Sequence, residues 1–294
     1  MIANNKRLVL GTAQLGFPYG IANKQGQVSL DEAKKIIEYA ATKGISTLDT
    51  AIAYGNSEQR LGEIGVQNWR VVSKLPAVPD GCGDIHKWVM ESVYKSLQRL
   101  RVTSLYGLLL HRPKQLLERD GDCIYHSLLF LKARKLVEKI GISIYDPAEL
   151  HAYMHQYRFD IVQTPFNILD RRLIDTFWLD YLAECGTEVH VRSVFLQGLL
   201  LMTPSERPQK FNRFESLWEQ WEAWLKRTGF TRMQACLCFA LSFKEISKVI
   251  VGVDSLIQLK EILQAAECQV PNIPDELQSN DQALLNPARW GLLV

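Results

Sequence analysis

The amino-acid sequence predicts a closed (β/α)8 TIM barrel, and three observations support this fold class. Eight short apolar runs typical of strands are each followed by a stretch with helical spacing. Such alternation indicates a parallel sheet, because parallel strands need crossover connections that are usually helical. Eight units within 294 residues fit a closed barrel better than an open doubly wound sheet. No G-x-G-x-x-G string follows any strand, which argues further against an open dinucleotide-binding sheet.

The first β/α unit shows the pattern most clearly. The run Leu8–Gly11 predicts a strand, and Ser29 then opens the helical stretch SLDEAKKIIEYAATKG. Ser29 and Glu32 have the spacing of a capping box, which favours a helix start at this point. Gly44 follows the last helical residue and is the expected stop.

The remaining units follow in chain order, and no linker or low-complexity stretch divides them. We therefore expect residues 1–294 to form a single barrel domain. The further strands are expected at Ser46–Asp49, Arg70–Lys74, Leu105–Leu110, Ile140–Ser143, Asp160–Thr164, Glu188–Val194 and Lys248–Val253. The further helices are expected at SEQRLGEIG, DIHKWVMESVYKSLQRL, Ile124–Lys139, from Pro147, Leu173–Glu184, Glu215–Arg227, Arg232–Phe243 and SLIQLKEILQAAE.

Composition excludes several classes of protein. Hydrophobic residues make up 47% of the chain, which excludes an intrinsically disordered protein. The 34 Lys and Arg residues nearly balance 32 Asp and Glu residues, so nucleic acid is not an expected partner. No apolar run is long enough to span a membrane and no secretory signal opens the chain, so we expect a cytoplasmic protein without a membrane partner. The six cysteines match no zinc template, so no metal is expected and reduced cysteines should fill the core.

Polar side chains at the ends of consecutive strands are the first candidates for function. In (β/α)8 barrels the active site lies at the C-terminal ends of the strands. Asp49 ends the second strand, Lys74 ends the third, and the fourth leads directly into His111. Tyr54 follows in the loop after the second strand. Taken alone, Asp49 would be read as a helix cap, Lys74 as a lysine whose charge reaches solvent, and His111 as a core residue. Together with Tyr54, they need a shared explanation.

Proton donation to a carbonyl oxygen explains the combination. An unperturbed tyrosine has a pKa of about 10, and a lysine ammonium beside the hydroxyl favours the phenolate. Lys74 needs a counter-charge when desolvated, and Asp49 supplies it. His111 would hydrogen-bond the carbonyl oxygen of a substrate. Because none of the four side chains is an electron donor, the hydride of a reduction must come from a cofactor.

At these residues the chain resembles the aldo-keto reductase superfamily. The resemblance covers nearly the whole length, through LVLGTAQLG, GISTLDTAIAYGNSEQRLG, VVSKLP, LLLHRP, KIGIS, DIVQTPFN, VRSVFLQGLL and VIVGVDSLIQLKE in order. The string D-x-A-x-x-Y-G-x-S-E is its most specific part. The resemblance implies that Tyr54 is the general acid, that Lys74 and Asp49 tune it, and that His111 positions the carbonyl. It also implies a barrel that binds a nicotinamide dinucleotide without a Rossmann motif.

The same resemblance implies a set of cofactor contacts. Ser143 and Gln163 correspond to the positions that hold the carboxamide, and Arg192 to the position beside the nicotinamide ring. The helix that starts near Ser255 would also present free backbone N–H groups to a phosphate. The implied cofactor contacts are Gly11, Thr12, Asp49, Ser143, Gln163, Arg192, Ser193, Phe195, Gln197, Gly252, Asp254, Ser255, Gln258 and Glu261.

Three departures from the family pattern concern the cofactor. Ile144 and Ile262 each stand where family members commonly have Asn. Asp254 stands at the position usually filled by Arg or Lys for the 2′-phosphate, where a carboxylate favours a bare ribose hydroxyl. Lys260 or Arg232 would have to compensate. The family norm implies NADPH, and NADH is not excluded.

The expected partner is a small-molecule carbonyl substrate: an aldehyde, a ketone or a sugar-like compound. Arg112 and Lys114 are either solvated loop charges or a means of drawing an anionic substrate to the mouth. Two other functions stay open. One is a nucleotide-binding regulatory subunit of the same fold with little turnover, and the other is an aldolase in which Lys74 forms a Schiff base. Pairing with Asp49 disfavours the second, because it keeps the lysine protonated. The oligomeric state is not indicated.

Overall fold

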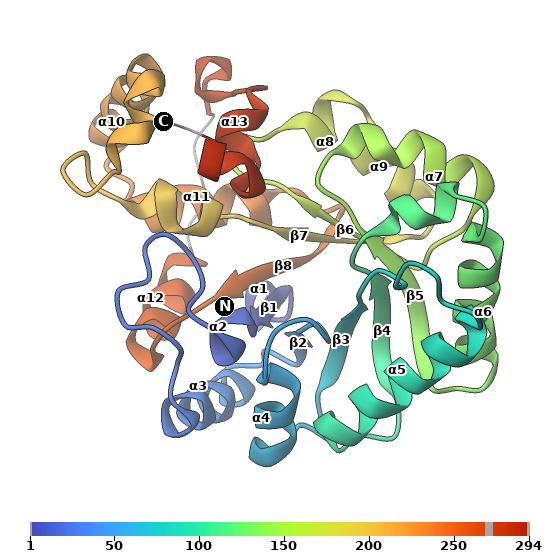
Figure 1. Cartoon of the computed structure of the whole chain (residues 1–294). Coiled ribbons are helices and arrows are strands. Elements are labelled where there is room, and N and C mark those ends of the chain that lie inside the picture. The colour runs from blue at the N-terminus through green and yellow to red at the C-terminus, as the bar shows by residue number, and fades with distance from the viewer. Residues whose placement is uncertain (1, 268–272, 293–294) are drawn as a thin grey trace.

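The computed structural model describes residues 2–267 and 273–292, and their strands form a closed parallel barrel (Figure 1). The strands pair in sequence order and β1 closes the barrel by pairing with β8. The predicted (β/α)8 TIM barrel is therefore confirmed. The strands are β1 (Leu8–Gly11), β2 (Thr47–Asp49), β3 (Arg70–Leu75), β4 (Leu105–Leu110), β5 (Val137–Ser143), β6 (Ile161–Pro165), β7 (Glu188–Arg192) and β8 (Ile246–Gly252).

Helices surround the barrel, as Figure 1 shows. Short 3-10 helices η1–η6 span Pro113–Leu117, Pro147–Glu149, Leu196–Leu201, Gln209–Phe214, Asp275–Leu277 and Pro287–Leu292. The α-helices are α1 (Ile2–Asn5), α2 (Ala13–Gly16), α3 (Leu30–Thr42), α4 (Ser57–Ile64), α5 (Ile85–Leu100), α6 (Gly121–Ala133), α7 (Leu150–Gln156), α8 (Arg172–Asp175), α9 (Trp178–Glu184), α10 (Glu215–Thr228), α11 (Arg232–Ser242), α12 (Leu256–Ala265) and α13 (Gln282–Leu285).

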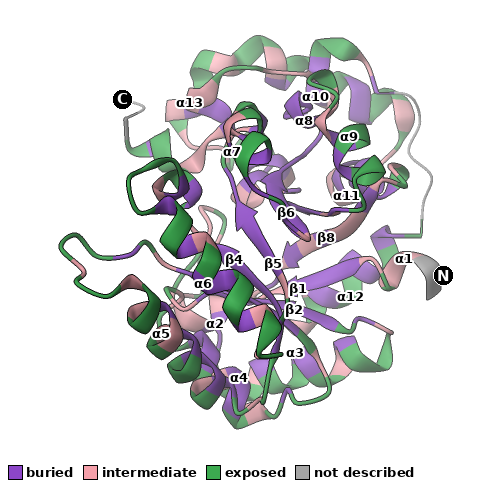
Figure 2. Ribbon diagram, turned by 90° about the vertical axis from the view of Figure 1, so that its right-hand side faces the viewer, coloured by how far each residue is buried: buried purple, intermediate pink, exposed green. Residues whose placement is uncertain are grey.

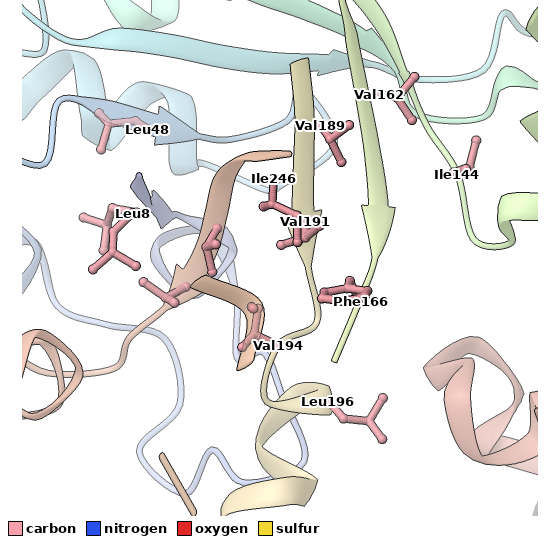
Figure 3. Close-up of a cluster of buried hydrophobic side chains, with 14 of the residues drawn as sticks. Leu8, Leu48, Ile144, Val162, Phe166, Val189, Val191, Val194, Leu196 and Ile246 are labelled. Carbon is pink, nitrogen blue, oxygen red and sulfur yellow. The ribbon is translucent and has the colours of Figure 1, made fainter. Parts of the chain in front are cut away.

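The main core lies between the strands and the helices. Figure 2 shows buried strands in the middle and helices whose outer faces are exposed. Figure 3 shows part of this core, in which Leu8, Leu48, Val189 and Val191 are fully buried. Burying an aliphatic side chain of this size contributes roughly 1.5–3 kcal/mol. This packing makes the barrel a rigid frame for the residues at the ends of its strands.

The ends of α3 follow the expected signals in part. The hydroxyl of Ser29 accepts a hydrogen bond from the backbone N–H of Glu32 at 3.2 Å, and Gly44 after the helix has a φ of +84°. The side chain of Glu32 does not return to the Ser29 backbone as a capping box requires. It accepts the backbone N–H of Leu256 at 2.8 Å and so joins α3 to the start of α12.

Two expected helices differ from the structure. The helix expected at Ile124–Lys139 ends at Ala133, because Lys135 turns the chain with a φ of +58° and β5 begins at Val137. Val137 and Ile140 are buried and belong to β5. In the sequence their apolar side chains continue the helical spacing, which is why the helix was expected to extend to Lys139. The helix expected at Leu173–Glu184 is divided into α8 and α9 by Phe177, which has a φ of +59°.

The expectation of six reduced core cysteines is wrong in part. Cys238 on α11 is disulfide-bonded. Its neighbour Cys236 is free and buried, whereas Cys123 and Cys185 are free and exposed. Cys268 lies outside the described residues. Residues two apart on a helix point in different directions, so the side chains of Cys236 and Cys238 have different surroundings. The spacing alone does not indicate which cysteine forms a disulfide.

Across residues 2–267 and 273–292, no helix combines the length and apolar character needed to cross a membrane. Within the same residues, no three His, Cys, Asp or Glu side chains form a group suited to a metal ion.

Candidate active site

The register of the barrel brings the expected residues to one level at the C-terminal ends of the strands. Gly11 at the end of β1 pairs with Asp49 on one side and with Gly252 on the other. Ser143 on β5 pairs with Gln163 on β6 in the same way. Because all eight strands are parallel, these side chains share one mouth of the barrel.

Asp49 is the centre of this level. Its carboxylate is 5% exposed and accepts two hydrogen bonds, from Lys74 Nζ to Oδ2 at 2.5 Å and from Gln163 Nε2 to Oδ1 at 2.7 Å. Thr12 donates both its backbone N–H and its hydroxyl to the Asp49 carbonyl oxygen. Side chains from β3 and β6 therefore fix the carboxylate, and Thr12, which follows β1, fixes the Asp49 backbone.

Lys74 is 1% exposed, and its ammonium is held by two acceptors. Besides Asp49, it donates to the carbonyl oxygen of Thr50 at 2.9 Å. Burial lowers the pKa of Lys74, and the nearby Asp49 carboxylate opposes that effect. An amine engaged as a donor to two acceptors is a poor nucleophile, so the contacts do not favour the Schiff-base alternative.

Tyr54 lies in the loop between β2 and α4, with its ring between two members of the group. Lys74 Nζ lies 5.1 Å from the centroid of the Tyr54 ring, and the His111 ring meets it edge-on at 5.8 Å. Burial and the Asp49 carboxylate raise the pKa of Tyr54, while Arg192 acts in the lowering direction. The expected shift toward the phenolate is thus not present, because burial and the Asp49 carboxylate dominate the pKa of Tyr54.

The loop that carries Tyr54 is packed backbone against backbone. A Cβ atom added to Gly16 would lie 1.9 Å from the carbonyl oxygen of Tyr54, and one added to Gly55 would lie 2.5 Å from the carbonyl oxygen of Gly16. Gly55 also has a φ of +52°, which disfavours a side chain. The close approach of these two loops sets the height of the Tyr54 ring above the barrel.

His111 follows β4 directly, and its backbone N–H donates to the carbonyl oxygen of Leu75 at 2.9 Å. Burial, with the positive charge of Lys74 in addition, lowers the pKa of His111 to about 4. The imidazole is therefore neutral at pH 7. Among the described residues, none forms a hydrogen bond with the His111 ring nitrogens or with the Tyr54 hydroxyl, which leaves both groups to a ligand.

A cavity of about 570 Å³ opens beside these residues, a size typical of small-molecule sites. Lys74, His111, Ser143, Gln163 and Ser255 do not line it. The expected residues that do line it are Gly11, Thr12, Asp49, Tyr54, Arg192, Ser193, Phe195, Gln197, Gly252, Asp254, Gln258 and Glu261.

The expected carboxamide contacts are engaged with each other. The Ser143 hydroxyl donates to Gln163 Oε1 at 3.2 Å, and both side chains are buried. The nearby Ile144 presents only its carbonyl oxygen, which accepts from Arg192 Nη2 at 2.9 Å. Arg192 thus reaches from β7 across to the end of β5.

The start of α12 differs from the expectation of free N–H groups. The N–H of Leu256 donates to Glu32, and the N–H of Gln258 donates to the Ser255 hydroxyl at 3.2 Å. Ser255 acts as a helix cap. The expectation that the helix start offers free N–H groups to a phosphate is therefore wrong for Leu256 and Gln258, because their N–H groups already donate to side chains.

Asp254 lies at the same end of the cavity, where Asn23 Nδ2 donates to its Oδ1 at 3.1 Å. Burial raises the pKa of Asp254. The two cations expected to offset its charge lie elsewhere. Lys260 Nζ lies 5.4 Å from the Tyr39 ring centroid, beside a second cavity, and Arg232 forms an ion pair with Glu222.

The sequence did not point to the long segment after β1, which forms one wall of the cavity. Tyr19, Ala22 and Asn23 line it together with Gln197 and Gly198. A Cβ atom added to Gly198 would lie 2.5 Å from Ala22 Cβ, so the two segments touch. The only signal in the sequence was the length of this connection, which exceeds that of a usual βα loop.

Comparisons with known proteins agree with this geometry. The family model of the aldo/keto reductase family matches residues 7–277. The chain is 25% identical to an uncharacterized oxidoreductase, YqkF, of Bacillus subtilis (strain 168), over 88% of this chain and 90% of that protein. It is 26% identical to L-galactose dehydrogenase of Arabidopsis thaliana, over 90% and 87% of the two chains.

Solved structures show the same fold. The holo form of aldo-keto reductase AKR11C1 from Bacillus halodurans is similar with a TM-score of 0.72 and 22% identity, over 90% of this chain and 88% of that one. With the family match and the oxidoreductase relatives, these findings support an oxidoreductase. The chain belongs to the aldo/keto reductase family.

Proposed function

We propose that this protein reduces an aldehyde, ketone or sugar-like carbonyl to the alcohol, with a nicotinamide dinucleotide as cofactor and Tyr54 as proton donor. The observation that carries the proposal is the convergence of Asp49, Lys74, Tyr54 and His111 beside the cavity of about 570 Å³. The Tyr54 hydroxyl and the His111 imidazole are the two polar groups that can meet a substrate oxygen.

Each residue has a distinct part in the proposed reaction. Tyr54 is protonated at neutral pH, because its pKa is raised, and can give its proton to an oxygen that becomes an alkoxide. Neutral His111 carries one N–H and can donate it to the same oxygen. Lys74, fixed by Asp49, places a positive charge over the Tyr54 ring and stabilises the phenolate that forms. The cofactor, when bound, supplies the hydride.

The cavity fits a long, partly anionic cofactor at its glycine-rich wall. Support for this placement comes from Gly11 and Gly252, which line the cavity where the family resemblance places the cofactor. We propose that NADH is accepted at least as well as NADPH. Support comes from Asp254 and Glu261 on the wall, because their charges repel a 2′-phosphate.

The substrate class is supported by the names of two relatives. One is L-galactose dehydrogenase, and another, D-threo-aldose 1-dehydrogenase of Pseudomonas sp, is 24% identical over 89% of this chain and 92% of that protein. Both names describe the oxidation of sugars. We therefore place sugar-like carbonyls within the proposed class, and we propose that the chain acts as a single barrel domain.

Fluorescence titration with NADH and NADPH, followed by turnover of an aldehyde panel, tests the proposal. We expect saturable binding of a dinucleotide and reduction of at least one carbonyl, with Tyr54→Phe as the inactive control. Binding without turnover of any carbonyl would instead support a regulatory subunit. Absence of binding would contradict both functions.

A further inference from the structure

Arg192 is a cation on the cavity wall that has no acidic partner. It stands at the end of β7 and lines the cavity together with Asp49 and Tyr54. Its side chain donates two hydrogen bonds to neutral acceptors, from Nη2 to the Ile144 carbonyl oxygen at 2.9 Å and from Nη1 to Ser193 Oγ at 3.2 Å. Within residues 2–267 and 273–292, no carboxylate lies within 4.0 Å of its guanidinium nitrogens. A half-buried guanidinium usually pairs with an anion, so this one lacks its expected partner.

The charge balance of the mouth points the same way. Asp49 and Lys74 neutralise each other at 2.5 Å, and His111 is neutral at pH 7. Arg192 lines the same cavity as Tyr54 and, unlike Lys74, has no ion-pair partner among the described residues. The acidic side chains Glu206, Asp254 and Glu261 also line this cavity. The Arg192 charge acts to lower the pKa of both Tyr54 and His111, although burial is the larger influence on each.

The direction of the side chain places the charge on the substrate side. The guanidinium stacks on Tyr145, with Cζ 4.6 Å from the ring centroid, beyond the end of β5. In the barrel order β5 adjoins β4, which ends directly before His111, whereas Gly252 ends β8 and Asp254 follows it. The cation thus faces the proposed carbonyl site and points away from the adenosine end of the cavity.

We propose that Arg192 binds a carboxylate of the substrate, and that the substrates are carbonyl compounds with a carboxylate within a few bonds of the carbonyl carbon. The proposal rests on the proposed reductase function. Arg192 is then a specificity-determining residue, since a guanidinium matches a carboxylate in a planar, bidentate geometry. The pyrophosphate of the cofactor is the other anion that could meet this side chain, and the test separates the two.

The kinetic test compares each carboxylate with its methyl ester, in two pairs: phenylglyoxylate and 4-carboxybenzaldehyde with their esters. We expect wild type to prefer the carboxylate in at least one pair by about tenfold or more in kcat/KM. Arg192→Met should bring that ratio close to one, and Arg192→Lys should keep part of it. Arg112→Met, which removes an exposed charge next to His111, should leave the ratio within about twofold, since solvent and salt screen that charge.

A binding measurement keeps the inference separate from the proposed function. Calorimetry compares the affinities of phenylacetate and phenylacetamide and needs no turnover. The preference for phenylacetate should be lost in Arg192→Met and kept in Arg112→Met. If no carbonyl is reduced, the proposed function fails while this measurement still decides on the anion. The inference is overturned if the carboxylate preference survives Arg192→Met, or is lost equally in Arg112→Met. It is also overturned if Arg192→Met weakens dinucleotide binding and leaves the preference unchanged.

Discussion

Each end of the barrel holds a carboxylate paired with a lysine, but the two ends differ in how completely they are satisfied. At the N-terminal end, Glu188 accepts from Tyr106 at 2.7 Å, from Lys139 at 2.6 Å and from His190 at 3.1 Å. Burial alone would raise the pKa of Glu188, but His190, Lys139 and Tyr106 lower it to about 2. Every polar group in this cluster has a protein partner.

The C-terminal end is satisfied only around Asp49. Lys74 and Gln163 each donate to one oxygen of the carboxylate, whereas the side chains of Tyr54 and Arg192 line a cavity. A closed polar network contributes to stability, and an open one has groups left for a ligand. At the two ends of this barrel, the hydrogen-bond partners of the side chains, more than the residue types, therefore distinguish a structural cluster from a candidate site.

The largest expected effect is the loss of stability and activity on replacing Lys74, compared with replacing Lys139. Lys74→Met leaves Asp49 buried without its counter-charge, which should lower the free energy of unfolding by about 3–5 kcal/mol. Carbonyl reduction should collapse, and any residual rate should peak at a different pH. Lys139→Met, whose side chain is 26% exposed in the wild type, should cost less stability and keep activity. Urea unfolding and pH–rate profiles measure both. An unchanged profile in Lys74→Met would count against its coupling to Tyr54.

Replacement of Tyr54 should affect mainly catalysis, whereas replacement of Tyr106 should affect mainly stability. Tyr54→Phe should lower kcat by at least about 10²-fold with dinucleotide affinity within a few-fold, because only the proton donor is lost. Tyr106→Phe removes a hydrogen bond to Glu188 and should cost about 1 kcal/mol of stability with kcat unchanged. Near wild-type turnover in Tyr54→Phe would show that another group is the acid.

The Glu188 cluster at the N-terminal end should make folding stability depend on pH. The pKa of Glu188 is about 2 in the folded protein against 4.5 ordinarily, so its contribution is present above pH 4.5 and is lost as the pH falls toward 2. The amount is on the order of 2–3 kcal/mol. Glu188→Gln should lack it at pH 7 and approach wild type near pH 2. Denaturant unfolding at several pH values measures this, and parallel curves for both proteins would refute it.

The smallest effect concerns the cofactor end of the cavity. Asp254→Arg should shift the ratio of dissociation constants toward NADPH by about 5- to 30-fold, or about 1–2 kcal/mol for a partly buried charge. The ratio is measured by fluorescence titration of both proteins with NADPH and NADH. Identical ratios would show that the Asp254 carboxylate does not face the adenosine ribose.

The barrel and its central group could be predicted from the sequence, because both depend on local signals. Asp49, Lys74 and His111 are adjacent to strand ends, and parallel strands bring their ends together whatever the connections do. The contact of Gln163 with Asp49 spans the barrel from β6 to β2 and was not predicted. The roles assigned to these residues stay predictions.

Contacts made by long side chains could not be predicted in this way. Glu32 has the spacing of a capping box, yet its carboxylate reaches α12, and Arg192 crosses from β7 to β5. Asn23 contacts Asp254 across 231 positions of the chain. Such contacts depend on rotamers and on loop paths that leave no periodic pattern in the sequence.

The backbone contact between Gly16 and Gly55 has a mechanical consequence. Because neither loop can move past the other without a clash, the first turn after β1 and the turn that carries Tyr54 form one fixed support. Any opening of the cavity wall must therefore bend the chain beyond Gly16, between Phe17 and Val28. Alanine at Gly16 or Gly55 would displace the Tyr54 ring without altering a single polar group. The geometry of the proposed proton transfer thus depends on the absence of a side chain at Gly16 and Gly55 as well as on the charges around Tyr54.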